Sequence, residues 1–312
     1  MNKYPVWIDT DTGVDDAIAL LTAFKLDKLE VVGISAVCGN TTHENAFRNA
    51  RNVTYLAGQD IKVYPGSERP LVKPLITSVE AHGENGLGGA IIDDSPVEKE
   101  TKKAWDAMYE KAKELNGELI IIAIGPLTNI ATAILLDPKT MKKVPRITIM
   151  GCAHPYNNPH TTSAEFNIMC DPEAAKVVFE SDIPIWVATL EACWYENRFD
   201  EKDIAYFKSI NELGAFCMDI NRTMIDLSRK LHGEGSMDLP DCAAFLLLTR
   251  PDLIKHGFEA YTRIETKGTY TRGASIFETK EHHYSKDFHI NSYIVDKIDG
   301  IGFKKYLEEL IK

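Results

Sequence analysis

The sequence of 312 residues lacks a long apolar run, a basic region and any paired cysteine motif. No apolar stretch approaches the roughly 20 residues that a membrane-spanning helix needs. The six cysteines are scattered without a Cys-x-x-Cys pair, so the sequence indicates neither a zinc site nor a disulfide framework. No apolar leader with a cleavage site precedes the first apolar run. We therefore expect a cytoplasmic protein with reduced thiols.

Basic residues are too few to suggest a nucleic-acid partner. Lys and Arg number 35 against 46 Asp and Glu, which gives a formal net charge of −11. Binding a phosphate backbone requires a clustered basic face, and this balance does not favour one. The composition favours a small neutral or cationic ligand, or a metal ion, and we expect no membrane partner.

The chain also lacks internal repeats and Pro/Gly/Ser-rich linkers, so we expect one domain over residues 1–312. Short apolar runs alternate with amphipathic segments, which predicts a parallel sheet covered on both faces by helices. The predicted fold is α/β, with a Rossmann-like, open and mostly parallel sheet. Residues 195–240 are predicted to form a helical, lid-bearing region. The main predicted strands comprise residues 6–8, 29–37, 118–124, 146–150 and 183–189.

Four polar or glycine-bearing segments each follow one of these predicted strands. In open α/β sheets, ligands bind beyond the carboxyl ends of the strands, where such segments emerge. We therefore expect the functional site at that edge of the sheet. The four segments begin at Asp9, Cys38, Gly125 and Gly151.

The first segment, DTDTGVDD at residues 9–16, carries four carboxylates. Two unit charges about 5 Å apart repel by roughly 3 kcal/mol at an effective dielectric near 20. The end of a helix offsets only about 0.3–1 kcal/mol per anion. A divalent cation can offset more, and Gly13 permits a tight turn that aims several carboxylates at one point. Hard oxygen ligands select Mg²⁺ or Ca²⁺, and a cage of protein carboxylates and carbonyls favours Ca²⁺.

Two other interpretations of this segment stay open. Acids in the first turn commonly cap a surface helix, although four acids after a buried strand exceed what a cap requires. An Asp-x-Asp pair after an apolar strand is also typical of Mg²⁺-dependent haloacid-dehalogenase phosphohydrolases, in which the first Asp is the nucleophile. Gly13 stands where those enzymes usually have Thr or Val, and their mechanism leaves Asp15 and Asp16 without a role.

From Trp7 to about Asp241, the sequence resembles the inosine-uridine-preferring nucleoside hydrolases. The resemblance implies a calcium-dependent enzyme that cleaves ribonucleosides into base and ribose, and a homodimer or homotetramer. Six motifs carry it in order: DTDTGVDDAIAL (9–20), CGN (38–40), HGENGLGG (82–89), GPLTNIA (125–131), IMG (149–151) and AEFNIMCDPEAA (164–175).

The resemblance also implies which residues bind the metal and the sugar. Asp9 is expected to orient its neighbours. The implied metal ligands are Asp11, Asp16, the backbone carbonyl of Ile124, and Asp241. The implied sugar-binding residues are Asp15, Asn40, Asn158, Glu165 and Asn167.

Cleaving an N-ribosyl bond builds positive charge on the sugar, which an anionic pocket stabilises. Metal binding activates a water, and Asp11 is the expected acceptor of its proton. Pro240 stands where many members have a His that protonates the leaving base, so we expect His82 to supply this proton. His232 is an alternative acid, and Trp194 or Tyr195 could instead stack on the base.

The replacement by Pro240 leaves a third class of function open, a nucleoside-binding protein without catalysis. The leaving base is also open, because the recognised motifs concern the sugar and the metal. Purine, pyrimidine and modified deazapurine nucleosides all remain candidates.

Overall fold

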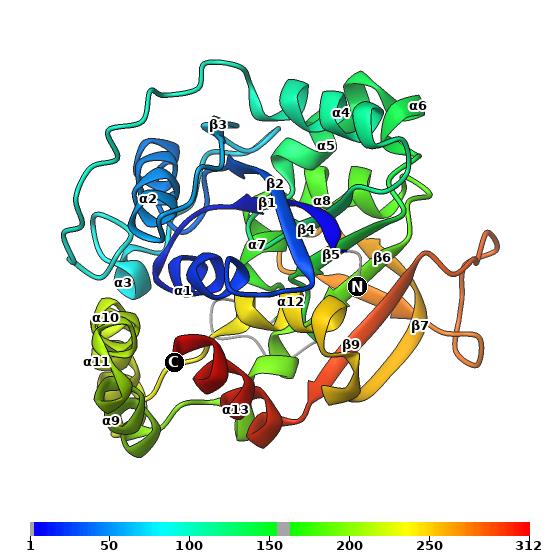
Figure 1. Cartoon of the computed structure of the whole chain (residues 1–312). Coiled ribbons are helices and arrows are strands. Elements are labelled where there is room, and N and C mark those ends of the chain that lie inside the picture. Colours follow the sequence, from blue (N-terminus) through cyan, green and yellow to red (C-terminus); the bar gives the residue numbers. More distant parts are fainter. Residues whose placement is uncertain (1–2, 155–162) are drawn as a thin grey trace.

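The computed structural model describes residues 3–154 and 163–312, and a nine-stranded sheet lies at its centre (Figure 1). The strand order is β3-β2-β1-β4-β5-β6-β9-β7-β8, and neighbours from β3 to β9 are parallel. β7 is antiparallel to both β9 and β8. The strands are β1 (Tyr4–Thr10), β2 (Leu29–Ala36), β3 (Val63–Pro65), β4 (Ile120–Ala123), β5 (Arg146–Met150), β6 (Ile185–Ala188), β7 (Ile254–Ile264), β8 (Ser275–Glu278) and β9 (Ser292–Ile298).

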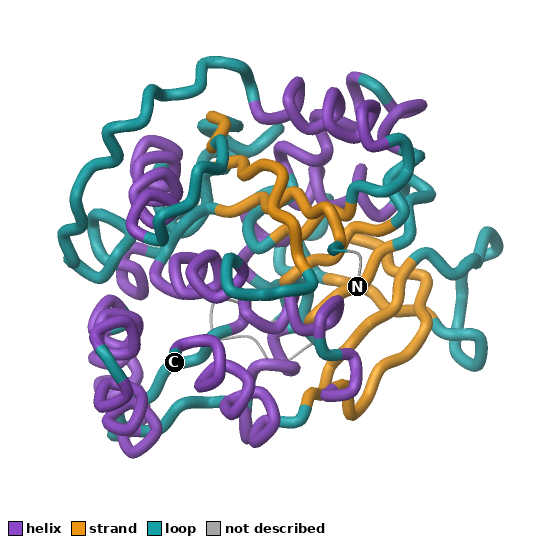
Figure 2. Tube along the Cα trace, in the orientation of Figure 1, coloured by secondary structure: helices purple, strands orange, loops and turns teal. Residues whose placement is uncertain are grey.

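Helices cover both faces of the sheet (Figure 2). The α-helices are α1 (Val14–Ala23), α2 (His43–Leu56), α3 (Val79–His82), α4 (Ala104–Leu115), α5 (Thr128–Leu136), α6 (Pro138–Met141), α7 (Phe166–Cys170), α8 (Pro172–Phe179), α9 (Glu201–Ile210), α10 (Glu212–Ile220), α11 (Arg222–His232), α12 (Pro240–Thr249) and α13 (Gly300–Ile311). Short 3₁₀ helices are η1 (Leu190–Cys193), η2 (Tyr195–Asn197) and η3 (Pro251–Leu253).

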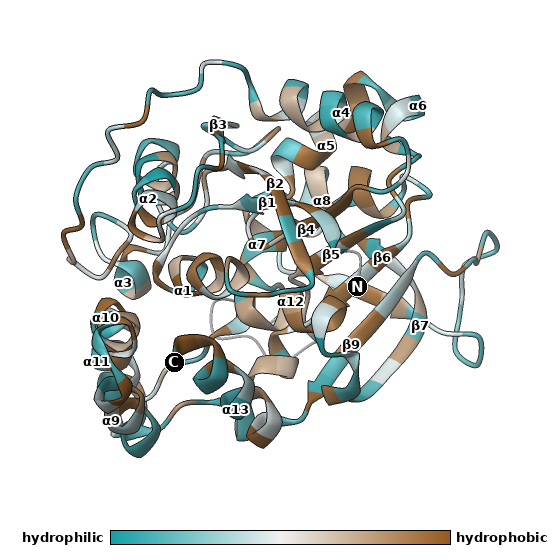
Figure 3. Ribbon diagram, in the orientation of Figure 1, coloured by the Kyte–Doolittle hydropathy of each residue, from teal (hydrophilic) through white to brown (hydrophobic). Residues whose placement is uncertain are grey.

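Side chains of β1 divide between two hydrophobic cores, one on each face of the sheet. Val6 and Ile8 pack in the core that contains α1, α12 and α13. Trp7 packs in the other core, with α4, α5 and α8. Burial on both faces explains why the central strands are continuous apolar runs, which Figure 3 shows as hydrophobic residues along the middle of the sheet.

The sheet and its flanking helices confirm the predicted α/β fold and single-domain architecture. The five main predicted strands correspond to β1, β2, β4, β5 and β6. β3 was not predicted, because three residues ending in a proline are too short to show a strand pattern. Residues 201–232 form α9, α10 and α11, within the region 195–240 that was expected to carry a lid. No helix in the described part of the chain is long and apolar enough to cross a membrane.

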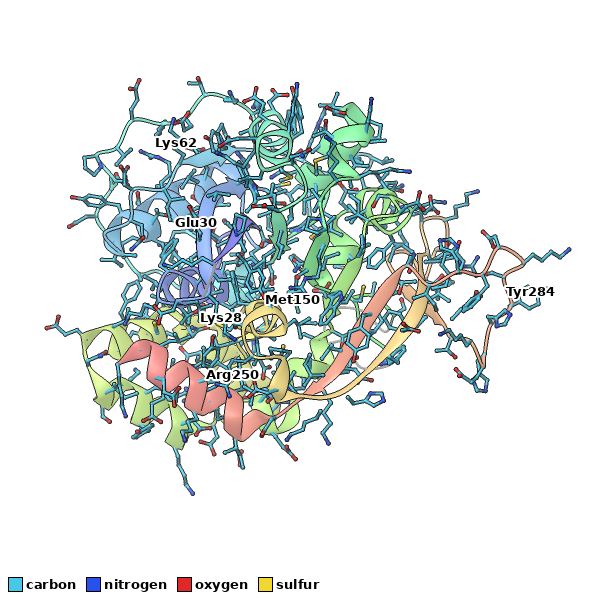
Figure 4. The ribbon with its side chains drawn as sticks, turned by 45° about the vertical axis from the view of Figure 1, so that its right-hand side comes forward. Lys28, Glu30, Lys62, Met150, Arg250 and Tyr284 are labelled. Carbon is cyan, nitrogen blue, oxygen red and sulfur yellow. The ribbon has the colours of Figure 1, made fainter. Side chains whose placement is uncertain are left out.

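The centre of the sheet and the loop after β8 differ in how exposed they are. Met150, at the carboxyl end of β5, is 3% exposed and lies in the interior (Figure 4). Tyr284, in the loop between β8 and β9, is 95% exposed and lies on a projection at the edge of the molecule (Figure 4). The polar segments after β1 and β2 are enclosed, since Asp11, Asp16 and Asn40 are all buried, whereas the loop after β8 projects into solvent.

Gly33 of β2 provides a test of how closely the first two strands pack. It is the register partner of Trp7, and a Cβ at this position would lie 2.4 Å from the Trp7 ring. Trp7 is 1% exposed and donates a 2.8 Å hydrogen bond to Ser35 Oγ, so the ring has little room to move. We expect Gly33→Ala to lower the free energy of unfolding by about 1–3 kcal/mol in urea denaturation.

Glu30→Ala is the control for this measurement, because Glu30 lies on the same strand and is exposed. We expect this control to change the free energy of unfolding by less than about 0.5 kcal/mol. Equal stability of Gly33→Ala and the parent protein would contradict the close contact with Trp7.

Candidate active site

The predicted site lies where the strand order of the sheet reverses. β2 and β3 extend from one side of β1, and β4, β5 and β6 extend from the other. Open α/β sheets bind ligands at such a switch point, beyond the carboxyl ends of the strands. β1, β2, β4 and β5 are parallel, so the segments that follow them, which are the four predicted ones, all leave the sheet at this edge.

Asp16, in the first turn of α1, is fully buried and held by three uncharged donors. Thr10 Oγ1 donates to Asp16 Oδ1 at 2.6 Å. The Gly13 N–H and Asn40 Nδ2 both donate to Asp16 Oδ2, each at 2.9 Å. These bonds fix the direction of the carboxylate, but none of the three donors carries a positive charge.

Asp11 is also fully buried, and two glycines make the space for it. The Asn40 N–H donates to Asp11 Oδ2 at 2.6 Å. A Cβ at Gly39 would lie 2.0 Å from Asp11 Oδ2, and a Cβ at Gly125 would lie 2.8 Å from Asp11 Oδ1. The glycines of the CGN and GPLTN motifs are therefore required by the close approach of this carboxylate.

Asp241, in the first turn of α12, brings a carboxylate from a distant part of the sequence. Carboxylate oxygens of Asp15, Asp16 and Asp241 lie within 4.8 Å of one another, and all three residues are buried. Asp15 Oδ1 and Asp241 Oδ2 have no hydrogen-bond partner within the described residues. His82 Nδ1 lies 3.7 Å from Asp15 Oδ1, and no Lys or Arg in residues 3–154 or 163–312 forms an ion pair with the three acids.

Burial raises the pKa of every acid in this group. The pKa values of Asp15 and Asp16 rise to about 6, and that of Asp241 rises well above its usual range. After burial, the second-largest cause of the raised pKa is a neighbouring negative charge. It is the charge of Asp15 for both Asp16 and Asp241, and the charge of Asp16 for Asp11. Negative charge is thus concentrated where a cation would stabilise it.

The donors present fit a hard divalent cation. Carboxylate and carbonyl oxygens are the ligands that Mg²⁺ and Ca²⁺ prefer. One buried oxygen on each of Asp11, Asp15 and Asp241 has no hydrogen-bond partner in the described structure, and a cation would satisfy such atoms. The closest three-carboxylate group contains Asp15 rather than Asp11, so the geometry adds Asp15 to the predicted set of ligands.

The predicted sugar-binding residues Glu165 and Asn167 lie at the start of α7. Glu165 caps this helix, since its carboxylate accepts hydrogen bonds from the backbone N–H groups of Asn167 (3.0 Å) and Ile168 (3.2 Å). Asn167 Nδ2 donates to the carbonyls of Ile124 (3.2 Å) and Met150 (3.3 Å), at the ends of β4 and β5. Burial raises the pKa of Glu165 to about 7. The predicted residue Asn158 lies outside the described residues.

His82, at the end of α3, is 5% exposed and contacts the loop that follows β1. Its Nδ1 accepts a hydrogen bond from the Val14 N–H at 3.2 Å. Because Nδ1 is an acceptor, the neutral ring carries its proton on Nε2. A Cβ at Gly13 would lie 2.4 Å from His82 Nδ1, so glycine is required for this contact.

The alternatives to His82 are placed differently. His232 is exposed at the end of α11. Trp194 is partly buried after η1, and the side chain of Tyr195 is not among those described. Pro240 is the first residue of α12, directly before Asp241.

Two features of the site were not predicted from the sequence. Thr10 binds Asp16, whereas Asp9 lies on the other face of β1 and accepts hydrogen bonds from Ser35 Oγ and from Asn129 Nδ2 (2.8 Å). Burial raises the pKa of Asp9 to about 7. Successive side chains of a strand point to opposite faces of the sheet, so Asp9 shares a face with Trp7, and Thr10 shares one with Ile8. This pattern could have placed Asp9 and Thr10 on opposite faces from the sequence alone.

The model of the inosine-uridine preferring nucleoside hydrolase family matches residues 6–305. The chain belongs to this family. The match confirms the predicted family and enzyme class, and it excludes the haloacid-dehalogenase interpretation of the opening motif. This nucleoside hydrolase is 32% identical to the pyrimidine-specific ribonucleoside hydrolase RihA of Salmonella gallinarum, over 99% of this chain and 98% of that protein.

Two of three similar solved structures carry a purine preference in their names. The plant nucleoside hydrolase PpNRh1 has a TM-score of 0.92 and 28% identity, covering 99% of this chain and 98% of that one. The purine-preferring ribonucleoside hydrolase from Gardnerella vaginalis has a TM-score of 0.87 and 27% identity, covering 98% of each chain. An inosine-guanosine nucleoside hydrolase has a TM-score of 0.89 and 25% identity, covering 100% of this chain and 99% of that one.

The buried acids predict how the stability of the cation-free protein depends on pH. Folding raises the pKa values of Asp15 and Asp16 to about 6, so the folded state binds more protons than the unfolded state between about pH 4 and 6. Stability should therefore fall as pH rises through this interval, by up to roughly 1.4 kcal/mol per group per pH unit. Thermal melting in EDTA, followed across this range, measures the decline, and we expect added Ca²⁺ to reverse it.

Asp241→Asn removes one of the mutually repelling carboxylates. We expect the variant to lose less stability with rising pH in EDTA and to gain less from Ca²⁺ than the parent protein. Asp93→Asn is the control, because Asp93 is exposed and should leave both responses unchanged. Parent-like behaviour of Asp241→Asn in both conditions would contradict a cation site at this cluster.

Proposed function

We propose that the protein hydrolyses the N-glycosidic bond of ribonucleosides with the aid of a Ca²⁺ ion at the Asp cluster. The observation that carries the proposal is the group of Asp15, Asp16 and Asp241, buried together with partnerless oxygens at the switch point of the sheet. A cation and a positively charged sugar would both lower the repulsion within this group.

Asp11, Asp16, Asp241 and the carbonyl of Ile124 would hold the ion, and Asp15 is close enough to join them. When bound, Ca²⁺ supplies a Lewis acid that lowers the pKa of water and binds vicinal ribose hydroxyls. Asp16 is oriented by Thr10, and Asp11 is oriented by Asn40. Rigid placement of these oxygens is what a site with several protein ligands requires.

The sugar would bind between this cluster and α7. Asp15 and Asn167 provide an acceptor and an amide for ribose hydroxyls, and Asn40 holds the adjoining loop. Glu165 and Asn158 would bind the 5′ end of the sugar. The raised pKa of Glu165 makes a protonated, hydrogen-bond-donating form accessible near neutral pH.

In the reaction, the oxygen of water bonds to C1′ of the ribose as the bond between C1′ and the base nitrogen breaks. The bonding electron pair leaves with the base, and C1′ develops oxocarbenium character that the surrounding carboxylates stabilise. Asp11 accepts one proton from the attacking water. The imidazolium form of His82 would donate its Nε2 proton to the departing base and become the neutral ring, with the remaining proton on Nδ1, 3.7 Å from Asp15 Oδ1. Free base and ribose are the products.

A panel of uridine, cytidine, inosine, guanosine and adenosine, assayed with Ca²⁺ for reducing sugar, tests this function. We expect ribose release from at least one of them, with the base identified by mass. Binding without product would instead support a nucleoside-binding protein, the alternative raised by Pro240. We also expect a cytoplasmic homodimer or homotetramer, which light scattering coupled to gel filtration tests for the oligomeric state.

Asp11→Ala and Asp16→Ala should abolish turnover without unfolding the protein. Asp11 is proposed both as a ligand and as the acceptor of the water proton, and loss of a general base alone costs about 10²–10⁴-fold. Initial rates of ribose release and circular dichroism spectra measure the two expectations. Asp93→Asn should retain full activity, whereas near-native hydrolysis by either active-site variant would rule out the mechanism.

His82→Asn should slow the reaction only when the leaving group needs a proton. We expect roughly 10²-fold lower kcat with a nucleoside substrate, a typical loss for a missing general acid. With 4-nitrophenyl β-D-ribofuranoside, whose phenolate leaves unprotonated, the rate should stay within about twofold of the parent rate. An equal loss with both substrates would exclude His82 as the proton donor.

A further inference from the structure

His82 begins a turn, residues 82–90, that is closed by its own backbone. The Gly88 N–H donates to the carbonyl of His82 at 2.8 Å, and the Gly86 N–H donates to the carbonyl of Gly83 at 3.1 Å. Asn85 Oδ1 accepts from the N–H groups of Leu87 and Gly89, both at 3.0 Å. The turn is therefore a compact unit, and its placement determines where the His82 ring lies.

Helix α2 anchors the middle of this turn to the main body of the protein. Asn49 Nδ2 donates to the carbonyls of Asn85 (2.9 Å) and Thr12 (3.2 Å). Asn45 Nδ2 donates to the carbonyl of Glu84 at 2.9 Å. These bonds hold residues 84 and 85, but none of them involves Ala81, the residue directly before His82.

Helix α11 makes the contact beside His82. Thr223 Oγ1, in the first turn of α11, donates to the carbonyl of Ala81 at 2.6 Å. Gly88 packs against the end of α10 so closely that a Cβ would lie 2.0 Å from the carbonyl oxygen of Ile220. Arg222 Nη2 also lies 3.4 Å from the Gly88 carbonyl. Figure 1 shows α3 beside α10 and α11, as these contacts require.

The helices that make these contacts belong to one segment, residues 200–236, whose two ends are held together. Phe199 and Met237 exchange backbone hydrogen bonds of 2.9 and 3.1 Å at the two ends of the segment. Arg198 and Asp238, next to them, form an ion pair with N–O distances of 3.2 and 3.1 Å.

The segment also packs on the body of the protein, because Ile220 and Ile225 lie in the core that contains α1. Lys304 of α13 donates to Asp203 of α9 at 2.6 Å, so both sets of contacts fix the position of α11.

We propose that Thr223 is a positioning residue that holds His82 in place, so that the contact of α11 with α3 completes the leaving-group side of the active site. The inference rests on the proposed function for the role of His82, but the placement of His82 can be measured without it. The ring is held between Gly13 and Val14 on one side and, through Ala81, Thr223 on the other.

Thr223→Val is the first test, because valine keeps the shape of threonine and removes only the hydroxyl donor. In the Ca²⁺-supplemented enzyme, we expect kcat for the best nucleoside of the panel to fall about tenfold, less than the loss of the acid itself. KM should change by less than about twofold, because the ground-state contacts with the sugar are unaffected. The rate with 4-nitrophenyl β-D-ribofuranoside should equal that of the parent enzyme.

Three further variants make the test specific. Thr223→Ser keeps the hydroxyl and should restore the nucleoside rate. Gly88→Ala should push the turn from Ile220 and repeat the selective loss, with its melting temperature measured to show that it is folded. Thr132→Val is the matched control, because Thr132 Oγ1 donates a 2.7 Å bond to the Thr128 carbonyl within α5, away from His82.

Selective loss in Thr223→Val with rescue by serine supports the proposal. Equal losses of rate in Thr223→Val with the nucleoside and the aryl riboside would overturn it. So would an unchanged nucleoside rate in Thr223→Val when His82→Asn is slower with the nucleoside. If His82→Asn shows no selective loss, the role assigned to His82 fails instead. The imidazole nitrogen signals of His82 in NMR spectra then test whether Thr223 holds the ring in place. A changed chemical shift in Thr223→Val supports this placement, and unchanged signals overturn it.

Discussion

Mutual repulsion among buried carboxylates is the constraint on which the rest of the site depends. Asp11, Asp15, Asp16 and Asp241 are all buried at the carboxyl end of β1. Hydrogen bonds from Thr10, Asn40 and backbone groups orient two of these acids, but uncharged donors cannot neutralise them. The surrounding fold must therefore hold the acids together against their repulsion until positive charge, from an ion or from the sugar, is present.

The glycines of the site serve this requirement through close packing. Gly39 and Gly125 leave room for the Asp11 carboxylate, and Gly13 leaves room for the His82 ring. None of the three has a positive φ, so a turn conformation does not explain them. A side chain introduced at any of these three glycines would displace Asp11 or His82. The glycines are therefore needed for the positions of these two side chains and not for a turn of the backbone.

How much the sequence predicted depends on how local each signal is. Long apolar strands such as β2 and the acids of residues 9–16 form continuous patterns, so the α/β fold and the acidic edge of the sheet were predictable. Asp241 was assigned only through resemblance, because nothing in its local sequence links it to Asp16. The bond from Thr223 to Ala81 spans 142 positions without any local pattern, and only the folded chain reveals it.

The two sides of the site are built from different parts of the fold, and this division bears on base selection. In the proposed mechanism, the ribose side consists of strand ends and first helical turns, and its acids would act on the sugar and its developing charge, which all ribonucleosides share. The leaving-group side consists of the turn at residues 82–90 and the helices that contact it. Selectivity can change on that second side without disturbing the first. Two proteins similar to this chain are named for opposite preferences: RihA of Salmonella gallinarum is pyrimidine-specific, and the hydrolase from Gardnerella vaginalis is purine-preferring.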